Sequence, residues 1–242
     1  MEEKDLTVVI PAYNEEKRIG KTINAIEEYL SKKDFNFEIV VVNDGSYDLT
    51  SNIVKELSLK YKNIKLIENE VNRGKGYSVK CGMLNSCGRY VLFIDADMST
   101  PISEIENILK FFKLDFDIII GSRRMRGSKV KICQPPFRRF LGWLFHIIRR
   151  IFYLYSIKDT QCGFKCFKKE VIKPIFTRET IDGFVFDVEV LFIAKKLGYK
   201  IKEVPVVWID DIRSTLIPHK HLKEVIRDLI KIRINNFKGL YK

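Results

Sequence analysis

The sequence contains no stretch of about 18 uncharged apolar residues, the shortest run expected of a helix that crosses a bilayer. We therefore expect no transmembrane helix. The first residues, MEEKDLTVVIP, are acidic and lead at once into a β-branched apolar run. Because a secretory signal peptide begins with basic residues, we do not expect one here.

Paired cysteines are also lacking. The five cysteines are odd in number, and no second pair with metal-ligand spacing accompanies Cys162 and Cys166. Disulfides are rare in cytosolic proteins, and we predict five reduced thiols in that compartment. A zinc site or a disulfide framework is not expected.

Acidic residues are scarce relative to basic ones. The 242 residues include 31 acidic and 43 basic side chains, which gives a formal net charge of +12. An excess of this size favours an anionic partner: a nucleic acid, an acidic membrane surface or a phosphorylated substrate. The net charge alone does not choose among the three.

Short apolar runs alternate with helical patterns through the first half of the chain, and this alternation fades after Ser122. Continuous apolar strands separated by helices predict an α/β fold with a mostly parallel sheet covered on both faces. In such sheets ligands bind at the carboxyl ends of the strands. Strands are expected at 6–11, 37–44, 64–69, 90–95 and 116–122, and helices at 15–31, 49–61, 74–86 and 102–112.

Two carboxylates follow the fourth expected strand, in the stretch VLFIDADMSTPISE. Asp95 and Asp97 lie two residues apart and therefore project toward one side of the chain. Close carboxylates repel unless a cation or a proton lies between them, and oxygen ligands suit Mg²⁺ or Mn²⁺. The alternative is a pair of turn or helix-capping aspartates, because a D-x-D motif is weak when taken alone.

Seven motifs in a fixed order carry a resemblance to a known family. Together they resemble the inverting nucleotide-sugar glycosyltransferases of family 2, and most of all the dolichyl-phosphate (polyprenyl-phosphate) glucosyltransferases and their mannose synthase relatives. The resemblance covers about residues 7–232. The motifs are VVIPAYNEE, VVNDGSYD, NRGKGYS, DADMSTP, DTQCGFKCF, DGFVFDVEVL and EVPVVW.

The resemblance implies a GT-A fold, with a Rossmann-like, mostly parallel sheet in one domain spanning residues 1–242. About residues 1–122 would form the nucleotide-sugar half. About residues 123–242 would form the acceptor half, with membrane-surface helices near 137–155 and 219–236.

The resemblance also implies a set of donor-binding residues. The loop after the first strand would cradle the nucleoside, and Asp44 would hydrogen-bond the base. Lys75 would lie near the pyrophosphate, and the cation would be held by Asp95 and Asp97. The full set is Pro11, Ala12, Tyr13, Glu15, Asp44, Lys75, Asp95, Ala96, Asp97 and Gln161.

The acceptor decides which other residues are needed. A hydroxyl acceptor requires a general base, whereas a polyprenyl phosphate is already ionised and needs cations that position it. By the resemblance, Arg123 and either Arg138 or Arg139 would surround the acceptor phosphate. Asp159 and Asp187 would orient the sugar or the arginines, or would act as base if the acceptor were a hydroxyl.

One departure from the family pattern falls in the stretch DDIRSTLIPHKH. Many relatives carry a lysine there that supplies a cation to the pyrophosphate, and this chain has Thr215 instead. Arg213, His219 and Lys220 are the candidates to replace it, and the sequence does not choose among them.

Two basic amphipathic segments are candidates for a membrane surface. A helix over 137–155 would gather Arg138, Arg139, Arg149 and Arg150 on one strip of an otherwise apolar surface, which is typical of an interfacial helix. The alternative is a buried core helix with a basic edge. The C-terminal segment would place its apolar side chains on one side, namely Leu222, Val225, Ile226, Leu229 and Ile230. Because anionic lipids attract clustered cations, we predict a peripheral, monotopic enzyme on the cytoplasmic face of a membrane.

The expected activity is therefore the inverting, metal-dependent transfer of a hexose to dolichyl or polyprenyl phosphate. The motif DTQCGFK resembles the glucosyltransferases of the family more than the mannose synthases and therefore favours UDP-glucose as donor. GDP-mannose as donor, or a hydroxyl of a glycan or protein as acceptor, remain alternatives. A nucleic-acid-binding protein would explain the charge, but strand-end carboxylates would repel its phosphates, so we expect no nucleic-acid partner.

Overall fold

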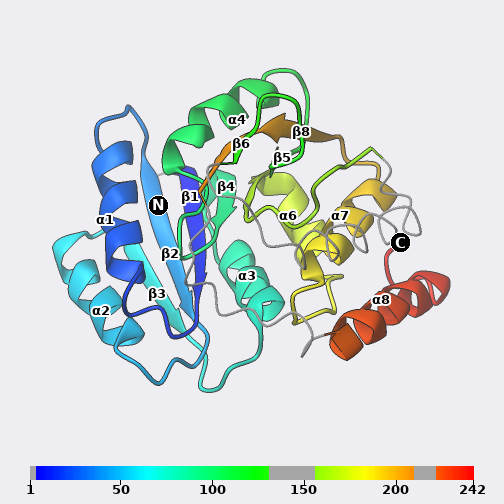
Figure 1. Cartoon of the computed structure of the whole chain (residues 1–242), viewed down its shortest axis with the longest axis horizontal. Coiled ribbons are helices and arrows are strands. Elements are labelled where there is room, and N and C mark those ends of the chain that lie inside the picture. Colours follow the sequence, from blue (N-terminus) through cyan, green and yellow to red (C-terminus); the bar gives the residue numbers. More distant parts are fainter. Residues whose placement is uncertain (1–3, 131–155, 210–221) are drawn as a thin grey trace.

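The computed structural model describes residues 4–130, 156–209 and 222–242, and these residues build one central sheet flanked by helices (Figure 1). The seven strands of the sheet lie in the order β3-β2-β1-β4-β7-β5-β8. Their bounds are β1 Lys4–Ala12, β2 Phe37–Asn43, β3 Ile64–Glu68, β4 Gly88–Ile94, β5 Ile118–Ser122, β7 Phe164–Lys168 and β8 Ile201–Pro205.

Strand β7 is the one strand of this sheet that runs antiparallel to its neighbours, β4 and β5. All other neighbouring strands pair in parallel, so the predicted mostly parallel sheet is confirmed. The insertion of β7 between β4 and β5 was not expected, because the alternating pattern fades after Ser122. Its direction places the residues that precede Phe164 at the carboxyl ends of β4 and β5.

Helices cover both faces of the sheet, and each face has its own apolar core. Helices α1, α2 and α4 pack on one face, and α3, α6, α7 and α8 pack on the other. Alternate strand residues supply the two cores, as the period of two along a strand requires. The helices are α1 Ile19–Leu30, α2 Thr50–Lys60, α3 Lys75–Leu84, α4 Ile105–Phe112, α6 Lys169–Phe176, α7 Phe186–Lys196 and α8 Leu222–Phe237, with a short 3₁₀ turn at Ile102–Glu104.

A second, two-stranded sheet lies beyond the end of β8. It pairs β6 (Lys129–Val130) with β9 (Val207–Trp208) in parallel. The backbone N–H of Ile209 donates to the carbonyl of Ser99, 2.8 Å away, which ties the segment after β9 to the loop after β4. This small sheet therefore borders the same edge of the main sheet as Asp95 and Asp97.

Helix α1 begins later than the sequence predicts. The apolar spacing predicted a helix from Glu15, but the structure begins it at Ile19. The backbone N–H of Glu15 donates to Thr50 Oγ1 at 2.7 Å, and that of Glu16 donates to an Asp48 carboxylate oxygen at 3.1 Å. These bonds hold the residues before α1 in a loop, and sequence periodicity does not reveal such long-range partners.

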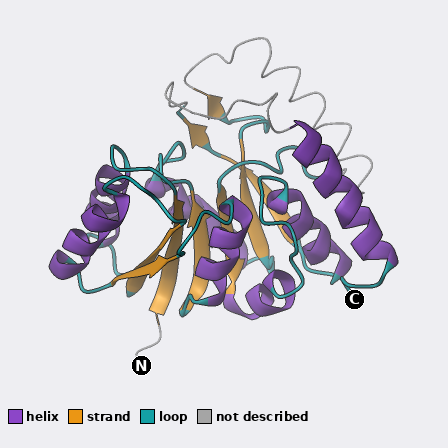
Figure 2. Cartoon of the chain, turned by 90° about the horizontal axis from the view of Figure 1, so that it is seen from below, coloured by secondary structure: helices purple, strands orange, loops and turns teal. Residues whose placement is uncertain are grey.

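Helix α8 corrects the predicted side of the C-terminal segment. Val225 and Leu229 pack against the core of the sheet, whereas Ile226 and Ile230 are exposed. The predicted apolar side is therefore divided: its part with Val225 and Leu229 is packed, and its part with Ile226 and Ile230 is exposed. Figure 2 shows α8 at the outer edge of the molecule, far from α1 and α2.

Several predictions lie outside the described residues. The basic helix over 137–155, with Arg138, Arg139, Arg149 and Arg150, is among them, as is the stretch around Thr215. Within the described ranges, no helix is both long and apolar enough to cross a membrane. The four cysteines of those ranges are free thiols: Cys81, Cys87, Cys162 and Cys166.

The segment between α6 and α7 buries a carboxyl group. Glu179 is 3% exposed, and within the described part of the chain neither of its side-chain oxygens has a hydrogen-bond partner. Burial raises the pKa of Glu179 well above its ordinary value of 4.5, and the neighbouring Glu189 carboxylate raises it further. The folded protein therefore keeps this proton where the unfolded chain has released it.

This proton makes stability depend on pH. Above about pH 4.5 the unfolded chain binds fewer protons than the folded one, so the free energy of unfolding falls as pH rises, by up to about 1.4 kcal/mol per pH unit, until the raised pKa is reached. We expect Glu179→Gln to remove this contribution, measured by urea unfolding at a series of pH values. Parallel pH profiles for the two proteins would contradict the assignment.

Candidate functional site

The loops after β1 and β2 interlock at the carboxyl edge of the sheet. Asn14, whose φ of 55° lies in the left-handed region, accepts through its side-chain oxygen from the backbone N–H of Tyr47 at 3.1 Å. Its own N–H donates to Ser46 Oγ at 2.9 Å. Exposed Tyr13 lies edge-on to Tyr47, with ring centroids 6.2 Å apart. The two loops thus present an aromatic pair beside the buried strand end at Pro11 and Ala12.

Asp44 braces the loop that leads into α3. Its carboxylate is buried and accepts from Asn69 Nδ2 at 2.8 Å and from the backbone N–H groups of Arg73 at 3.0 Å and Gly74 at 2.8 Å. Asp44 therefore fixes the start of α3 relative to β2, in addition to any contact with a ligand.

Asp95 lies between a lysine and a glycine. Lys75 Nζ, from the first residue of α3, is 2.6 Å from Asp95 Oδ1. A Cβ built on Gly163 would lie 1.9 Å from Asp95 Oδ2, so only glycine leaves room for this carboxylate. Burial alone would raise the pKa of Asp95, but Lys75 outweighs it, with help from Lys165 and Arg123, and the pKa is lowered.

The pKa values of Asp97 and Glu15 are raised, whereas that of Asp95 is lowered. Burial and then the Asp95 charge raise the pKa of Asp97, although its carboxylate accepts from the backbone N–H of Ser99 at 2.9 Å. Burial likewise raises the pKa of Glu15, which is paired with Arg18 and feels the charges of Asp97 and Asp95. The site therefore gathers three carboxyl groups, and burial and mutual repulsion raise the pKa of two of them, Asp97 and Glu15.

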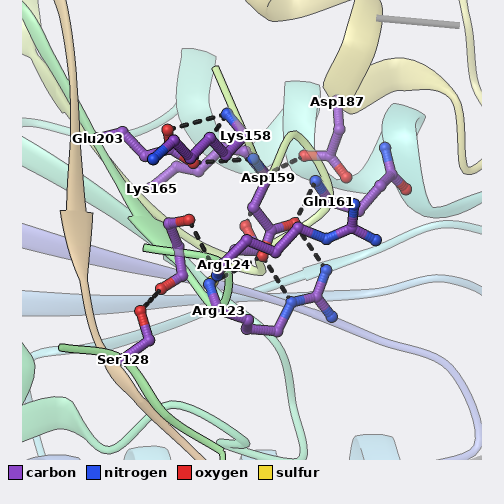
Figure 3. Close-up of polar contacts among 11 residues, drawn as sticks. Arg123, Arg124, Ser128, Lys158, Asp159, Gln161, Lys165, Asp187 and Glu203 are labelled. Atoms are coloured by element: carbon purple, nitrogen blue, oxygen red, sulfur yellow. Dashed lines mark hydrogen bonds and ion pairs between the residues drawn. The ribbon is translucent and has the colours of Figure 1, made fainter. Parts of the chain in front are cut away.

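Arg123 and Asp159 form a bidentate pair beside these carboxylates (Figure 3). Arg123 donates from Nε at 2.7 Å, from Nη2 at 2.8 Å and from its backbone N–H at 2.9 Å. Burial opposes ionisation of Asp159, but the bonds from Arg123 outweigh it and lower its pKa to about 2. The buried Glu203 carboxylate in turn accepts from the backbone N–H groups of Lys158 and Asp159, which fixes this loop.

A second buried ion pair joins Lys165 and Asp187. Lys165 Nζ donates to Asp187 Oδ1 at 2.5 Å and to the carbonyl of Cys162 at 2.6 Å. Burial raises the pKa of Asp187, and Lys165 and Lys75 only partly oppose it. Gln161 lies near Asp159 in Figure 3, as expected, and its Nε2 is buried without a hydrogen-bond partner among the described residues.

The structure therefore brings most of the predicted residues of this edge together. Lys75, Asp95, Asp97 and Glu15 influence one another electrostatically, and the Arg123 charge reaches Asp95. Ala96 is buried between the two aspartates, and its carbonyl accepts from Thr22 Oγ1 at 2.6 Å. Arg138 and Arg139 lie outside the described residues.

Sequence reasoning missed three residues of the site: Gly163, Lys165 and Glu203. Gly163 and Lys165 lie inside the motif DTQCGFKCF, and a lysine within an apolar strand is a signal of a buried ion pair. Glu203 begins the motif EVPVVW, but nothing local indicates that it accepts from backbone groups 44 and 45 residues away.

The carboxylates fit a divalent cation with few protein ligands. No group of three potential metal ligands is found within the described ranges, so a cation here would take ligands from the substrate as well. Mg²⁺ and Mn²⁺ commonly bind through one or two carboxylates plus phosphates. The mutual repulsion of Asp95 and Asp97, seen in the raised pKa of Asp97, is what such an ion would relieve.

Comparison with known proteins agrees with this geometry. Residues 7–176 match the family model described as glycosyl transferase family 2. A dolichyl-phosphate beta-glucosyltransferase of Trichomonas vaginalis is 38% identical, covering 98% of this chain and 75% of the relative. The enzyme of the same name from Dictyostelium discoideum is 37% identical, covering 98% of this chain and 76% of the relative.

A solved structure confirms the predicted GT-A fold. Glucosyl-3-phosphoglycerate synthase from Mycobacterium tuberculosis, in complex with Mn²⁺, uridine diphosphate and glucosyl-3-phosphoglycerate, superimposes with a TM-score of 0.68. The match covers 96% of this chain and 79% of that chain at 18% identity. The family model and the relatives together show that the chain belongs to glycosyl transferase family 2.

Proposed function

We propose that the protein transfers glucose from UDP-glucose to dolichyl or a related polyprenyl phosphate, with inversion at the sugar carbon. Two relatives named dolichyl-phosphate beta-glucosyltransferase support this proposal, because the similarity extends over 98% of this chain. The reaction forms a bond between an acceptor phosphate oxygen and C1 of glucose. It breaks the bond from C1 to the diphosphate, which leaves as UDP.

The donor would lie along the interlocked loops and the carboxyl ends of β1, β2 and β4. The nucleoside would be bound by Pro11, Ala12, Tyr13 and Glu15. Asp44 would bind the base while it holds the loop before Lys75 in place. Lys75 would contact the pyrophosphate. Its ammonium group would then divide its contacts between Asp95 and the leaving diphosphate. Gln161, whose buried Nε2 lacks a partner among the described residues, would donate to the sugar.

Asp95 and Asp97 would hold Mg²⁺ or Mn²⁺ together with the donor phosphates, and Ala96 would contact the donor between them. The bound ion would neutralise charge on the departing diphosphate. The fold neighbour with Mn²⁺ and uridine diphosphate supports this arrangement by analogy of fold. Asp97 supports it in this chain, because burial and then the Asp95 charge raise its pKa, and a cation between the two carboxylates would oppose that shift.

The acidic side chains of the site favour a phosphate acceptor over a hydroxyl acceptor. Asp159 has a pKa of about 2 and is engaged by Arg123 on both oxygens, so it is a poor proton acceptor at neutral pH. Asp187 is buried and paired with Lys165. A phosphate needs no base, and the Arg123 guanidinium keeps Nη1 outside its contact with Asp159. Arg123, with Arg138 or Arg139, would position that phosphate.

We also infer that the protein attaches to the cytoplasmic face of an anionic membrane. Ile226, Ile230, Ile234 and Phe237 of α8 are exposed, and at 100° per residue they fall within about 80° of arc. Exposed Arg227 borders this apolar stripe, and exposed Lys223 and Lys238 lie at its two ends. Apolar side chains flanked by cations are typical of a helix that lies in a membrane interface.

One incubation tests the activity. Purified protein with Mn²⁺ and dolichyl phosphate is offered UDP-glucose, GDP-mannose or UDP-N-acetylglucosamine, and lipid-linked sugar is separated by thin-layer chromatography. We expect product from UDP-glucose, and its loss when the cation is chelated. Product from GDP-mannose alone would reassign the donor, and transfer to a glycan hydroxyl but not to the lipid would overturn the acceptor.

Gly163→Ala tests the crowding around Asp95. The new Cβ would displace the carboxylate by about 1 Å or more, and a misplacement of that size lowers turnover on the order of 100-fold. The measurement is kcat with the preferred donor. Gly20→Ala in α1 is the matched control, because its Cβ would meet only the Ile53 side chain, at 3.3 Å, and a shift of that side chain by a few tenths of an ångström relieves the contact. Equal activity of the two variants would show that Asp95 need not occupy this position.

The apolar stripe of α8 is tested by vesicle binding. Replacing Ile226, Ile230 and Phe237 with serine removes apolar area that the membrane would bury, and we expect at least about a tenfold weaker partition. Co-sedimentation uses vesicles of phosphatidylcholine and phosphatidylserine. Leu59→Ser in α2 is the control, because Leu59 is 73% exposed but far from α8. Unchanged partition of the triple variant would remove α8 from the membrane contact.

A further inference from the structure

The segment 179–183, between α6 and α7, is held from one side by Glu189 of α7. Glu189 is fully buried. Its Oε2 accepts from the backbone N–H groups of Thr180 at 2.9 Å and Ile181 at 2.8 Å. Its Oε1 accepts from Thr180 Oγ1 at 2.8 Å. One carboxylate thus fixes both the backbone and a side chain of this segment.

The end of the described chain completes this network. The hydroxyl of Tyr241 donates to Glu189 Oε1. Asn235 of α8 donates from Nδ2 to Thr180 Oγ1 at 2.8 Å and to the Tyr241 hydroxyl at 3.2 Å. Burial and the Glu189 charge raise the pKa of Tyr241, so the phenol keeps the proton that it donates. Lys231 Nζ adds a bond to the Thr180 carbonyl at 2.7 Å.

The other side of the same segment holds the start of α3. The Asp182 carbonyl accepts from the backbone N–H groups of Gly76 at 2.7 Å and Tyr77 at 3.3 Å. Lys80 Nζ donates to the Glu179 carbonyl at 2.6 Å. The approach is close, since a Cβ on Gly76 would lie 2.3 Å from the Ile181 carbonyl oxygen.

Lys75 is the first residue of α3, directly before Gly76, and its ammonium pairs with Asp95. A continuous series of hydrogen bonds therefore runs from Tyr241 and Asn235 through Glu189 and the segment 179–183 to Gly76, the residue next to Lys75. The amides of Gly76 and Tyr77 are bonded to this segment rather than directed at a ligand. Lys75 depends on the segment for its position.

We propose that Tyr241 and Asn235 are positioning residues for the Lys75–Asp95 pair and act through Glu189 and the segment 179–183. The proposal rests on the proposed donor site, since it assigns these residues the task of placing its pyrophosphate cation. Because Glu189 keeps its bonds from Thr180 and Ile181 when the Tyr241 hydroxyl is lost, we expect the contact to loosen by only roughly three- to tenfold. Tyr241→Phe removes only the hydroxyl, and Asn235→Leu is a second, nearly isosteric variant.

Hydrogen exchange tests the structural link without any substrate. We expect Tyr241→Phe to speed exchange of the Gly76 and Tyr77 amides roughly three- to tenfold, with little change in β1 and β2. Tyr29→Phe is the matched control, since it removes a tyrosine–glutamate hydrogen bond to Glu106 far from α3. Unchanged exchange at Gly76 and Tyr77, or an equal increase throughout the sheet, would overturn the proposal.

A double-mutant cycle on binding of UDP with Mn²⁺ tests the functional link. We expect Tyr241→Phe to weaken binding roughly three- to tenfold in the native background and not at all in the Lys75→Met background. An equal loss in both backgrounds would mean that Tyr241 acts through general stability and would overturn the proposal. If the native protein bound no UDP, the donor assignment would fail, and the exchange measurement would still decide the role of Tyr241.

Discussion

Charge balance at the carboxyl end of β4 is the constraint on which the rest of the site depends. A buried strand that ends in Asp95 and Asp97 gathers negative charge where water is partly excluded, and this is unfavourable unless cations lie close by. Three cations lower the pKa of Asp95: Lys75, Lys165 and Arg123. Each comes from a different part of the chain, so the sheet must assemble before the carboxylates are compensated.

The direction of β7 contributes to the same charge balance. Because β7 runs antiparallel to β4 and β5, the residues before it arrive at the edge where those strands end. Asp159, Gln161 and Gly163 reach the site in this way, and Lys165 lies one residue inside the strand. A parallel strand at this place would have delivered its preceding loop to the opposite edge. The single antiparallel strand thus joins the two halves of the chain in one site.

The sequence predicted the strands and helices of the first half well, because each has its own periodicity. It also indicated Asp95, Asp97 and Arg123, since polar residues directly after apolar strands are visible without a structure, whereas Asp159 came from the resemblance of the motif DTQCGFKCF to the family. The later start of α1 and the split faces of α8 could not be predicted, because both depend on long-range partners. The roles of Gly163 and Lys165 were not predicted for the same reason, because their partners, Asp95 and Asp187, are distant in sequence.

Among the described residues, the three cations that lower the pKa of Asp95 each have an anionic partner, and this limits how a donor would enter. Lys75 pairs with Asp95, Lys165 with Asp187, and Arg123 with Asp159. A pyrophosphate arriving alone would add negative charge, and a divalent cation arriving alone would add positive charge near Lys75. Together they add little net charge, so the proposed donor site would favour joint binding of nucleotide and ion. One face of α8 supports the start of α3 through the segment 179–183, and another face exposes apolar side chains. The helix proposed to meet the membrane is therefore also proposed to influence the position of Lys75.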